Sequence, residues 1–200
     1  MARRSDHSLE EKRALALAAV RELAEEGGLR AITARAVADR MGYAVGTIYN
    51  IYGNLDELVA RANAETLDAL YDDLSAGSLG RAAHDRLREL ARRYVAFIAR
   101  HPGRWSAVIE APSVAELPIA EWYGEKVERL LRLAEDAIAS FFPAGEEAAR
   151  AEHARVLWSA LHGITIIAMQ GGKHRNDTIE AQIETLIRTY LAGLAAPRRA

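Results

Sequence analysis

Apolar residues recur at steps of three and four positions along almost the whole chain, and stretches that alternate apolar and polar residues are absent. This period matches the 3.6 residues of an α-helical turn, whereas a half-buried strand alternates. Clusters of glycine and proline interrupt the pattern at intervals. The sequence therefore predicts an all-α fold of about nine helices.

Caps and breakers set the expected helix boundaries. Ser8, Thr33 and Asn54 carry side chains that cap helix N-termini, and glycine or proline follows most of the apolar segments. The expected helices cover, approximately, residues 9–26, 33–41, 45–52, 54–74, 81–100, 104–110, 119–142, 146–169 and 177–194.

The second and third expected helices are short, and a break at Gly42 separates them. Two short helices joined by a tight turn with glycine form a helix-turn-helix, whose second helix enters the major groove of DNA. Val45, Ile48 and Tyr52 are expected to face the core. The other face of that helix is then left for nucleic acid.

Hydroxyl and amide groups on this outward face suit hydrogen bonds to phosphate oxygens and base edges. Thr33 and Arg35 begin the preceding helix, whose N-terminal amides suit a phosphate. Arg3 and Arg4 are candidates for an arm that reaches an adjacent groove. The expected DNA-contacting residues are Thr33, Arg35, Tyr43, Ala44, Gly46, Thr47, Tyr49, Asn50, Arg3 and Arg4.

A longer pattern surrounds this motif. The segment LALAAVRELAEEG over residues 15–27 is followed by Thr33, Val37-Ala38, Gly42, the run Gly46-Thr47-Ile48-Tyr49, Tyr52 and Leu58. These residues closely resemble the N-terminal domain of tetracycline-repressor-like (TetR/AcrR-type) transcriptional regulators. The resemblance implies a helix-turn-helix DNA-binding domain over residues 1–53 and a helical ligand-binding and dimerisation domain over residues 54–200.

The segment WSALHG over residues 158–163 also resembles a Trp-x-x-x-His-Gly signature in one C-terminal subgroup of these regulators. In the family, the C-terminal helices enclose a ligand cavity and the last two helices build a homodimer. The resemblance thus implies a repressor that a small, largely apolar ligand releases from a palindromic operator. The helix over residues 54–74 is expected to transmit the change.

Three positions depart from the residues that many family members carry. Ala44 stands in place of a serine, so the second helix of the motif lacks a capping hydroxyl worth roughly 1 kcal/mol. Tyr52 stands in place of a phenylalanine, and Leu55 stands in place of a lysine that contacts phosphate. One phosphate contact fewer predicts weaker and less salt-dependent DNA binding.

Large aromatic residues mark the C-terminal region. Such side chains line apolar ligand cavities that hold a few polar groups, although long helices also need aromatic residues as plain core. His162 fits a hydrogen-bonded core histidine as well as a ligand contact. The candidate ligand-binding residues are Tyr94, Phe97, Trp105, Ile109, Trp122, Tyr123, Trp158, His162 and Ile166.

The last two expected helices have wide apolar faces, which an isolated domain would not leave exposed. A two-fold interface buries both faces and presents two recognition helices to a palindromic operator, about one DNA turn apart. The candidate interface residues are Val156, Ala160, Gly163, Ile167, Ile183, Ile187, Tyr190 and Leu194.

Composition excludes several other classes of protein. The 200 residues include no cysteine and carry a formal net charge of −2. Disulfide scaffolds, thiolate metal sites and cysteine nucleophiles are therefore excluded, and affinity for DNA must come from a local basic patch. No secretion signal begins the chain, and no apolar run approaches the roughly 20 residues of a membrane span, which favours a cytoplasmic protein.

Motifs of enzymes are missing as well. No glutamate precedes a histidine by three positions, as a di-iron bundle requires, and no glycine-rich phosphate loop, nucleophile elbow or zinc-binding His-Glu-x-x-His helix occurs. The sequence predicts no enzymatic activity, no cofactor and no metal. The alternative to a DNA-binding regulator is an all-helical small-molecule-binding or interaction protein.

Overall fold

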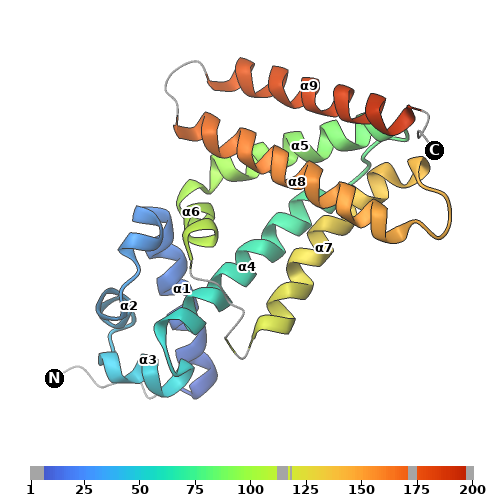
Figure 1. Cartoon of the computed structure of the whole chain (residues 1–200). Coiled ribbons are helices and arrows are strands. Elements are labelled where there is room, and N and C mark those ends of the chain that lie inside the picture. Colours follow the sequence, from blue (N-terminus) through green and yellow to red (C-terminus); the bar gives the residue numbers. More distant parts are fainter. Residues whose placement is uncertain (1–6, 112–116, 118, 171–174, 197–200) are drawn as a thin grey trace. The chain divides into compact units, whose positions relative to one another are not determined.

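The computed structural model describes residues 7–111, 117, 119–170 and 175–196. All regular structure in these residues is helical, which confirms the all-α prediction (Figure 1). The α-helices are α1 (Leu9–Gly27), α2 (Ala34–Met41), α3 (Val45–Tyr52), α4 (Leu55–Ser75), α5 (Ala83–Arg100), α6 (Pro102–Glu110), α7 (Ala120–Ile138), α8 (Glu147–Gln170) and α9 (Arg175–Ala195). Short 3-10 helices follow α1 (Gly28–Ala31) and α7 (Ala139–Phe141).

Packing divides the chain into two compact units. Unit 1 comprises Met1–Ala69 and Ile98–Lys126, and unit 2 comprises Leu70–Phe97 and Val127–Ala200. Helices α4, α5 and α7 therefore contribute residues to both units. The functional boundary expected after residue 53 is a different division of the chain and stays a prediction.

Capping side chains begin the helices where the sequence predicts them. The Ser8 hydroxyl accepts a hydrogen bond from the Glu11 backbone N–H (3.2 Å), and the Glu11 carboxylate accepts one from the Ser8 N–H (2.6 Å). The Thr33 hydroxyl accepts from the N–H of Ala36 at the start of α2 (3.1 Å), and the Asn54 side chain accepts from the N–H of Glu57 at the start of α4 (2.7 Å). These bonds satisfy donors that a helix N-terminus otherwise leaves free.

One hydrophobic core holds unit 1 together. Side chains from α1, α2, α3, α6 and the first turns of α4 meet in it, and Ala16, Val37, Ile48 and Leu58 are fully buried. Both helices of the predicted helix-turn-helix are thus anchored by one face each. Their remaining faces are available to solvent.

Helix α6 approaches the end of α1 very closely at Gly103. A Cβ atom at this position would lie 2.0 Å from the carbonyl oxygen of Ala24. Asn63 on α4 adds a buried hydrogen bond to the carbonyl oxygen of Ala107 on α6 (2.9 Å). Glycine at position 103 therefore allows α6 to become part of the core of unit 1.

In unit 2, α8 and α9 lie side by side and run in opposite directions (Figure 1). Ile179, Ile183 and Ile187 on α9 are buried, as are Ala154 and Leu157 on α8. Within the described residues, no helix is both long and apolar enough to cross a bilayer.

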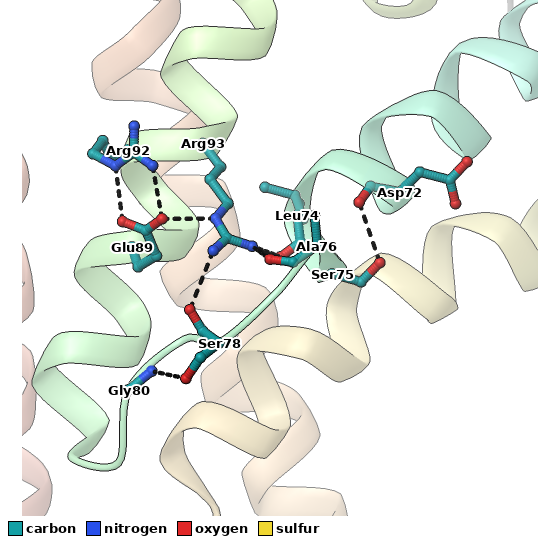
Figure 2. A network of polar contacts seen from close by, with 9 residues as sticks. All are labelled: Asp72, Leu74, Ser75, Ala76, Ser78, Gly80, Glu89, Arg92 and Arg93. Atoms are coloured by element: carbon teal, nitrogen blue, oxygen red, sulfur yellow. Dashed lines mark hydrogen bonds and ion pairs between the residues drawn. The ribbon is translucent and has the colours of Figure 1, made fainter.

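Arg93 on α5 fastens the C-terminus of α4 (Figure 2). Its guanidinium donates to the carbonyl oxygen of Leu74 (3.1 Å) and to two carbonyl groups of the following loop, while its Nε donates to Glu89 (2.8 Å). Hydrogen bonds from Arg92 and Arg93 lower the pKa of Glu89 to about 2. The last carbonyl groups of a helix lack partners within it, so Arg93 completes the end of α4.

Candidate nucleic-acid interface and apolar cavity

Helix α3 has one buried face and one exposed face. Ile48 and Tyr52 are 0% and 5% exposed and belong to the core of unit 1, as predicted. Val45, also expected in the core, is 36% exposed. It lies in the first turn of α3, one turn ahead of Ile48, where its side chain falls outside the core cluster.

The outward face of α3 carries the predicted polar contacts. Tyr49 is 47% exposed and Asn50 is exposed, while Thr47 is half-buried. Gly46 is exposed, with open space where a Cβ would lie. The arrangement places a phenol, an amide and a hydroxyl beside the uncovered backbone at Gly46, which suits close contact with DNA.

The preceding helix begins at the predicted cap. Thr33 is exposed, and its hydroxyl already accepts a hydrogen bond from the N–H of Ala36 (3.1 Å). Arg35 points into solvent, since its side chain is 88% exposed and its Nε lies 3.9 Å from an Asp39 oxygen. Arg3 and Arg4 lie outside the described residues.

Other charges near α2 are balanced locally. Arg40 donates to Glu26 (2.9 Å) and to Glu22 (2.8 Å), and these carboxylates raise the pKa of its guanidinium above the ordinary value. An arginine engaged in this way attracts a phosphate less than a solvated one. Arg35 is therefore the better candidate for a backbone contact on α2.

Two of the departures from the usual family residues have visible structural effects. Ala44 occupies the N-cap position of α3 without a side-chain hydrogen bond. The Tyr52 hydroxyl donates to the carbonyl oxygen of Arg13 (3.1 Å) and so links α3 to α1, and burial raises the pKa of this phenol.

Two residues that sequence reasoning missed lie against Tyr43, which is half-buried in the turn between α2 and α3. His7 Nδ1 lies 2.7 Å from the Tyr43 hydroxyl oxygen. Lys12 Nζ lies 5.6 Å from the centre of the Tyr43 ring. The sequence shows two basic residues near the N-terminus, but only the fold brings them to a tyrosine more than 30 positions away.

Unit 2 contains an apolar cavity of about 40 Å³. Ligand pockets generally measure about 300–1,000 Å³, so side chains must move before this cavity admits an organic molecule. The lining residues are Leu74, Leu87, Leu90, Ala91, Tyr94, Leu130, Leu133, Ala134, Leu157, Trp158, Leu161, Ile183, Leu186 and Ile187.

Tyr94 and Trp158 are the predicted ligand-binding residues that line this cavity. Their rings meet edge to face with centroids 5.1 Å apart. The Tyr94 hydroxyl lies 2.6 Å from His162 Nδ1, and burial lowers the pKa of that imidazole. His162 therefore has the hydrogen bond of a core histidine, while its contact with a ligand stays a prediction.

The other predicted ligand-binding residues do not line the apolar cavity. Phe97 is buried and Ile166 is half-buried in unit 2. Four more belong to unit 1, because helical periodicity identifies an apolar face but not the helix that it meets. These are Trp105 (buried), Ile109 (42% exposed), Trp122 (42% exposed) and Tyr123 (half-buried).

Trp122 lines a different cavity, within unit 1, of about 370 Å³. Charged side chains dominate its wall, including Glu57, Arg61 and Asp68. Lys126 pairs with Asp68 (2.6 Å) and lies 4.7 Å from the centre of the Trp122 ring. This polar cavity does not match the apolar site that the sequence predicts.

The predicted interface residues fall into two groups. On α8, Ile167 and Val156 are 73% and 48% exposed, with half-buried Ala160 and Gly163 on the same helix. On α9, Ile183 and Ile187 are instead 7% and 3% exposed and line the apolar cavity, contrary to the expectation of an outer face. Half-buried Tyr190 bonds to His153 (2.7 Å), and Leu194 is half-buried.

Two domain families match the chain. Residues 16–62 match the bacterial regulatory proteins of the tetR family, and residues 87–190 match the tetracyclin repressor-like C-terminal domain. The second match alone covers more than half of the 200 residues.

Relatives and solved structures agree with these matches. An uncharacterized HTH-type transcriptional regulator of Mycobacterium tuberculosis is 27% identical over 84% of this chain and 74% of its own length. Another uncharacterized HTH-type regulator, from Bacillus subtilis, is 26% identical over 88% of both chains. The crystal structure of a TetR transcriptional regulator from Rhodococcus sp. RHA1 shares the fold with a TM-score of 0.69, at 21% identity over 94% of this chain and 100% of that one.

Proposed function

Because the chain belongs to the tetracycline-repressor-like (TetR) family of transcriptional regulators, we propose that it binds a palindromic operator as a homodimer. We further propose that a small, largely apolar effector releases it and that it acts as a repressor in the cytoplasm. The proposed role involves no catalytic step.

The DNA-binding part of the proposal rests on α3, which has one buried face and one exposed face. Ile48 and Tyr52 fix the helix to the core, while Tyr49 and Asn50 project from the opposite side. A recognition helix needs this division, since it must stay anchored while its other face enters the major groove. Arg35 and the N-terminus of α2 supply a positive region beside it for the phosphate backbone.

Exposed aliphatic side chains on α8 support the proposed dimer. Ile167 is 73% exposed and Val156 is 48% exposed, and both are better shielded by a second copy of the helix than by water. Ala160 and Gly163 leave room for that helix to come close. Helix α9 joins the interface in this proposal through residues other than Ile183 and Ile187, which are already buried.

The lining of the cavity in unit 2 supports an uncharged effector. Aliphatic side chains dominate it, and the polar atoms of Tyr94 and Trp158 are those best placed to orient a guest. A charged ligand would lose its hydration there without a partner. Helix α4 runs without interruption from residues of unit 1 to residues of unit 2, and we propose that it carries the effect of the ligand to the DNA-binding face.

The double substitution Thr47→Ala with Tyr49→Phe tests the DNA contacts. Each hydrogen bond contributes roughly 0.5–1.5 kcal/mol, so the loss of two should cost about 1–3 kcal/mol and lower operator affinity about 5- to 150-fold. The probe is a duplex that the wild-type protein selects from random-sequence DNA, measured by fluorescence anisotropy at two salt concentrations with random DNA as competitor.

The substitution Thr185→Ala serves as a control, because Thr185 is exposed on α9 and its hydroxyl donates to the carbonyl oxygen of Ala181 on the same helix (2.8 Å). It should leave the affinity unchanged. Equal affinity of the double variant and the wild type would contradict the assigned contacts. A wild-type protein that binds no DNA at either salt concentration would favour the alternative of a helical ligand-binding or interaction protein.

A further inference from the structure

The polar cavity of unit 1 measures about 370 Å³, which lies within the range of sites that hold small molecules. Helices α1, α3, α4 and α7 all contribute to its wall, and its lining residues all belong to unit 1. The proposed operator contacts and the proposed effector cavity of unit 2 use other residues. The proposed function therefore leaves this cavity without a role.

Three carboxylates of α4 line the cavity, and each of them is paired with a cation. The pairs are Glu57–Arg61 (2.8 Å), Glu65–Arg21 (2.7 Å) and Asp68–Lys126 (2.6 Å). The negative charges are thus compensated within the protein. A cationic ligand would have to displace one of these partners before it could pair with a carboxylate.

Arg13 on α1 differs from these cations. Its backbone carbonyl oxygen accepts a hydrogen bond from the Tyr52 hydroxyl (3.1 Å), which holds this turn of α1 against α3. Within the described residues, its guanidinium has no carboxylate at ion-pair distance and no hydrogen-bond acceptor. The wall and the side chains paired with it therefore hold four cations and three carboxylates, which leaves one positive charge in excess.

Arg61 supplies a second guanidinium to the cavity. Its Nε and Nη2 both donate to Glu57 Oε1 (3.0 and 2.8 Å), while its Nη1 has no acceptor among the described residues. Burial raises the pKa of the Tyr52 phenol, and the positive charges of Arg61 and Arg13 act on that pKa in the opposite direction. The two guanidinium groups thus lie around the same phenol. Guanidinium groups bind carboxylates and phosphates through paired hydrogen bonds.

Another part of the wall is apolar. Leu17 on α1 and Ile51 on α3 are half-buried, and Trp122 on α7 is 42% exposed. Lys126 Nζ lies 4.7 Å from the centre of the Trp122 ring and 2.6 Å from the Asp68 carboxylate, so it holds the indole beside α4. An exposed indole gives the apolar part of a ligand a flat surface to pack against.

We propose that the polar cavity of unit 1 binds a small organic anion, a carboxylate or a phosphate ester with an apolar body, which accepts hydrogen bonds from Arg13 and packs against Trp122. This site differs from the apolar cavity of unit 2 in its charge and in the helices that form it. The inference goes beyond the proposed function, because the anion binds whether or not the chain binds DNA.

The first experiment locates the bound anion by NMR. The probe is phenylacetate, added to the full chain with nitrogen-15 in the indoles of its three tryptophans. Trp122→Phe removes one of these signals and so identifies it. We expect the Trp122 signal to shift and to saturate with a Kd of about 1 mM or tighter, as a ligand of this size allows. The signals of Trp105, which is buried, and Trp158, which lines the cavity of unit 2, should stay in place.

Uncharged and cationic analogues test the charge of the ligand. Phenylacetamide and phenethylamine keep the ring of phenylacetate, but the first is neutral and the second is positively charged. We expect both to bind at least about tenfold more weakly, because they lose the charge-assisted hydrogen bonds. Phenyl phosphate distinguishes the two kinds of anion: tighter binding than phenylacetate indicates a phosphate ester, and weaker binding indicates a carboxylate.

Matched substitutions of exposed arginines test the assigned contact. Arg13→Gln removes the guanidinium from the wall, and the affinity for phenylacetate should fall about tenfold, to that of phenylacetamide. Arg30→Gln makes the same change of charge at another exposed arginine of unit 1, in the 3-10 helix that follows α1. It should leave the Kd for phenylacetate unchanged.

Several outcomes would overturn the inference. A shift of the Trp158 signal instead of the Trp122 signal places the anion in unit 2. Tighter binding of phenethylamine than of phenylacetate, or an Arg13→Gln variant with the affinity of the wild type, contradicts the assigned charge or contact. The inference also fails if neither anion shifts the Trp122 signal. Because no DNA is present, these results leave the proposed function intact, and a chain that binds no DNA leaves the inference intact.

Discussion

The DNA-binding face of unit 1 and the cavity of unit 2 depend on the sequence in different ways. On α3, eight consecutive residues supply both the anchors and the outward contacts. In unit 2, the cavity is lined by residues of α4, α5, α7, α8 and α9, which lie more than 100 positions apart at the extremes. A local surface follows from the periodicity of one helix, whereas a cavity follows from how several helices meet.

The same contrast appears in how apolar residues are used. Unit 1 gathers aliphatic residues of five helices in one core that reaches backbone contact at Gly103, although Val45 and Ile109 stay exposed. The cavity of unit 2 is apolar, whereas charged side chains dominate the wall of the cavity in unit 1, and unit 2 leaves Ile167 73% exposed on α8. We relate the packed core behind α3 to the proposed recognition helix, and the apolar cavity and exposed Ile167 of unit 2 to the proposed effector site and dimer interface.

The largest expected effect comes from placing a charge on α9 of unit 2. Ile183→Asp introduces a carboxylate at a side chain that is 7% exposed and lines the cavity, so we expect a loss of about 4 kcal/mol in the free energy of unfolding. Ile167→Asp on α8 should change the stability of a single chain by less than about 0.5 kcal/mol but dissociate the proposed dimer.

Urea unfolding and sedimentation velocity, each over a range of protein concentrations, distinguish these two effects. Because a dimer is stabilised by its own concentration, the Ile167→Asp protein should unfold at a midpoint that no longer depends on concentration. A dimeric Ile167→Asp protein, or a fully stable Ile183→Asp protein, would contradict the division of α8 and α9 residues between interface and core.

A smaller loss in the free energy of unfolding is expected from adding a methyl group at Gly103, where α6 approaches the backbone of α1. In Gly103→Ala, the new Cβ meets the carbonyl oxygen of Ala24. This oxygen belongs to the backbone of α1 and cannot move without shifting the helix, so we expect the free energy of unfolding to fall by about 3 kcal/mol. This corresponds to a fall in Tm of about 6–12 °C. Calorimetry of Gly124→Ala provides the control, since a Cβ at that position of α7 meets nothing within 4 Å and should stabilise the helix by up to about 1 kcal/mol.

The sequence predicts most of the helices and the polar face of α3, because caps such as Ser8, Thr33 and Asn54 and the 3.6-residue period act over a few positions. It does not predict that Trp105 and Trp122 belong to unit 1, because an aromatic residue on an apolar face can pack against any partner helix. Nor does it predict that His7 reaches Tyr43, a contact between positions 36 residues apart. The three-dimensional structure is thus needed to identify the contacts of side chains whose partners lie far away in the sequence.

The smallest expected effect tests whether local sequence alone controls the recognition helix. Ala44 occupies the N-cap of α3 without a side-chain hydrogen bond, although the backbone there is extended as a cap requires (φ −74°, ψ 148°). In Ala44→Ser, the hydroxyl can accept from a free backbone N–H in the first turn, and we expect a gain of about 1 kcal/mol in stability. The Tm should rise by roughly 2–4 °C.

Because the cap orders the turn that carries Gly46 and Thr47, operator affinity should increase by no more than about fivefold, the equivalent of the same free energy. Ala44→Val lacks the hydroxyl and serves as the control. If Ala44→Ser raises Tm without changing affinity, the start of α3 is already ordered in the free protein, and the departure from serine at this position has no cost for DNA binding.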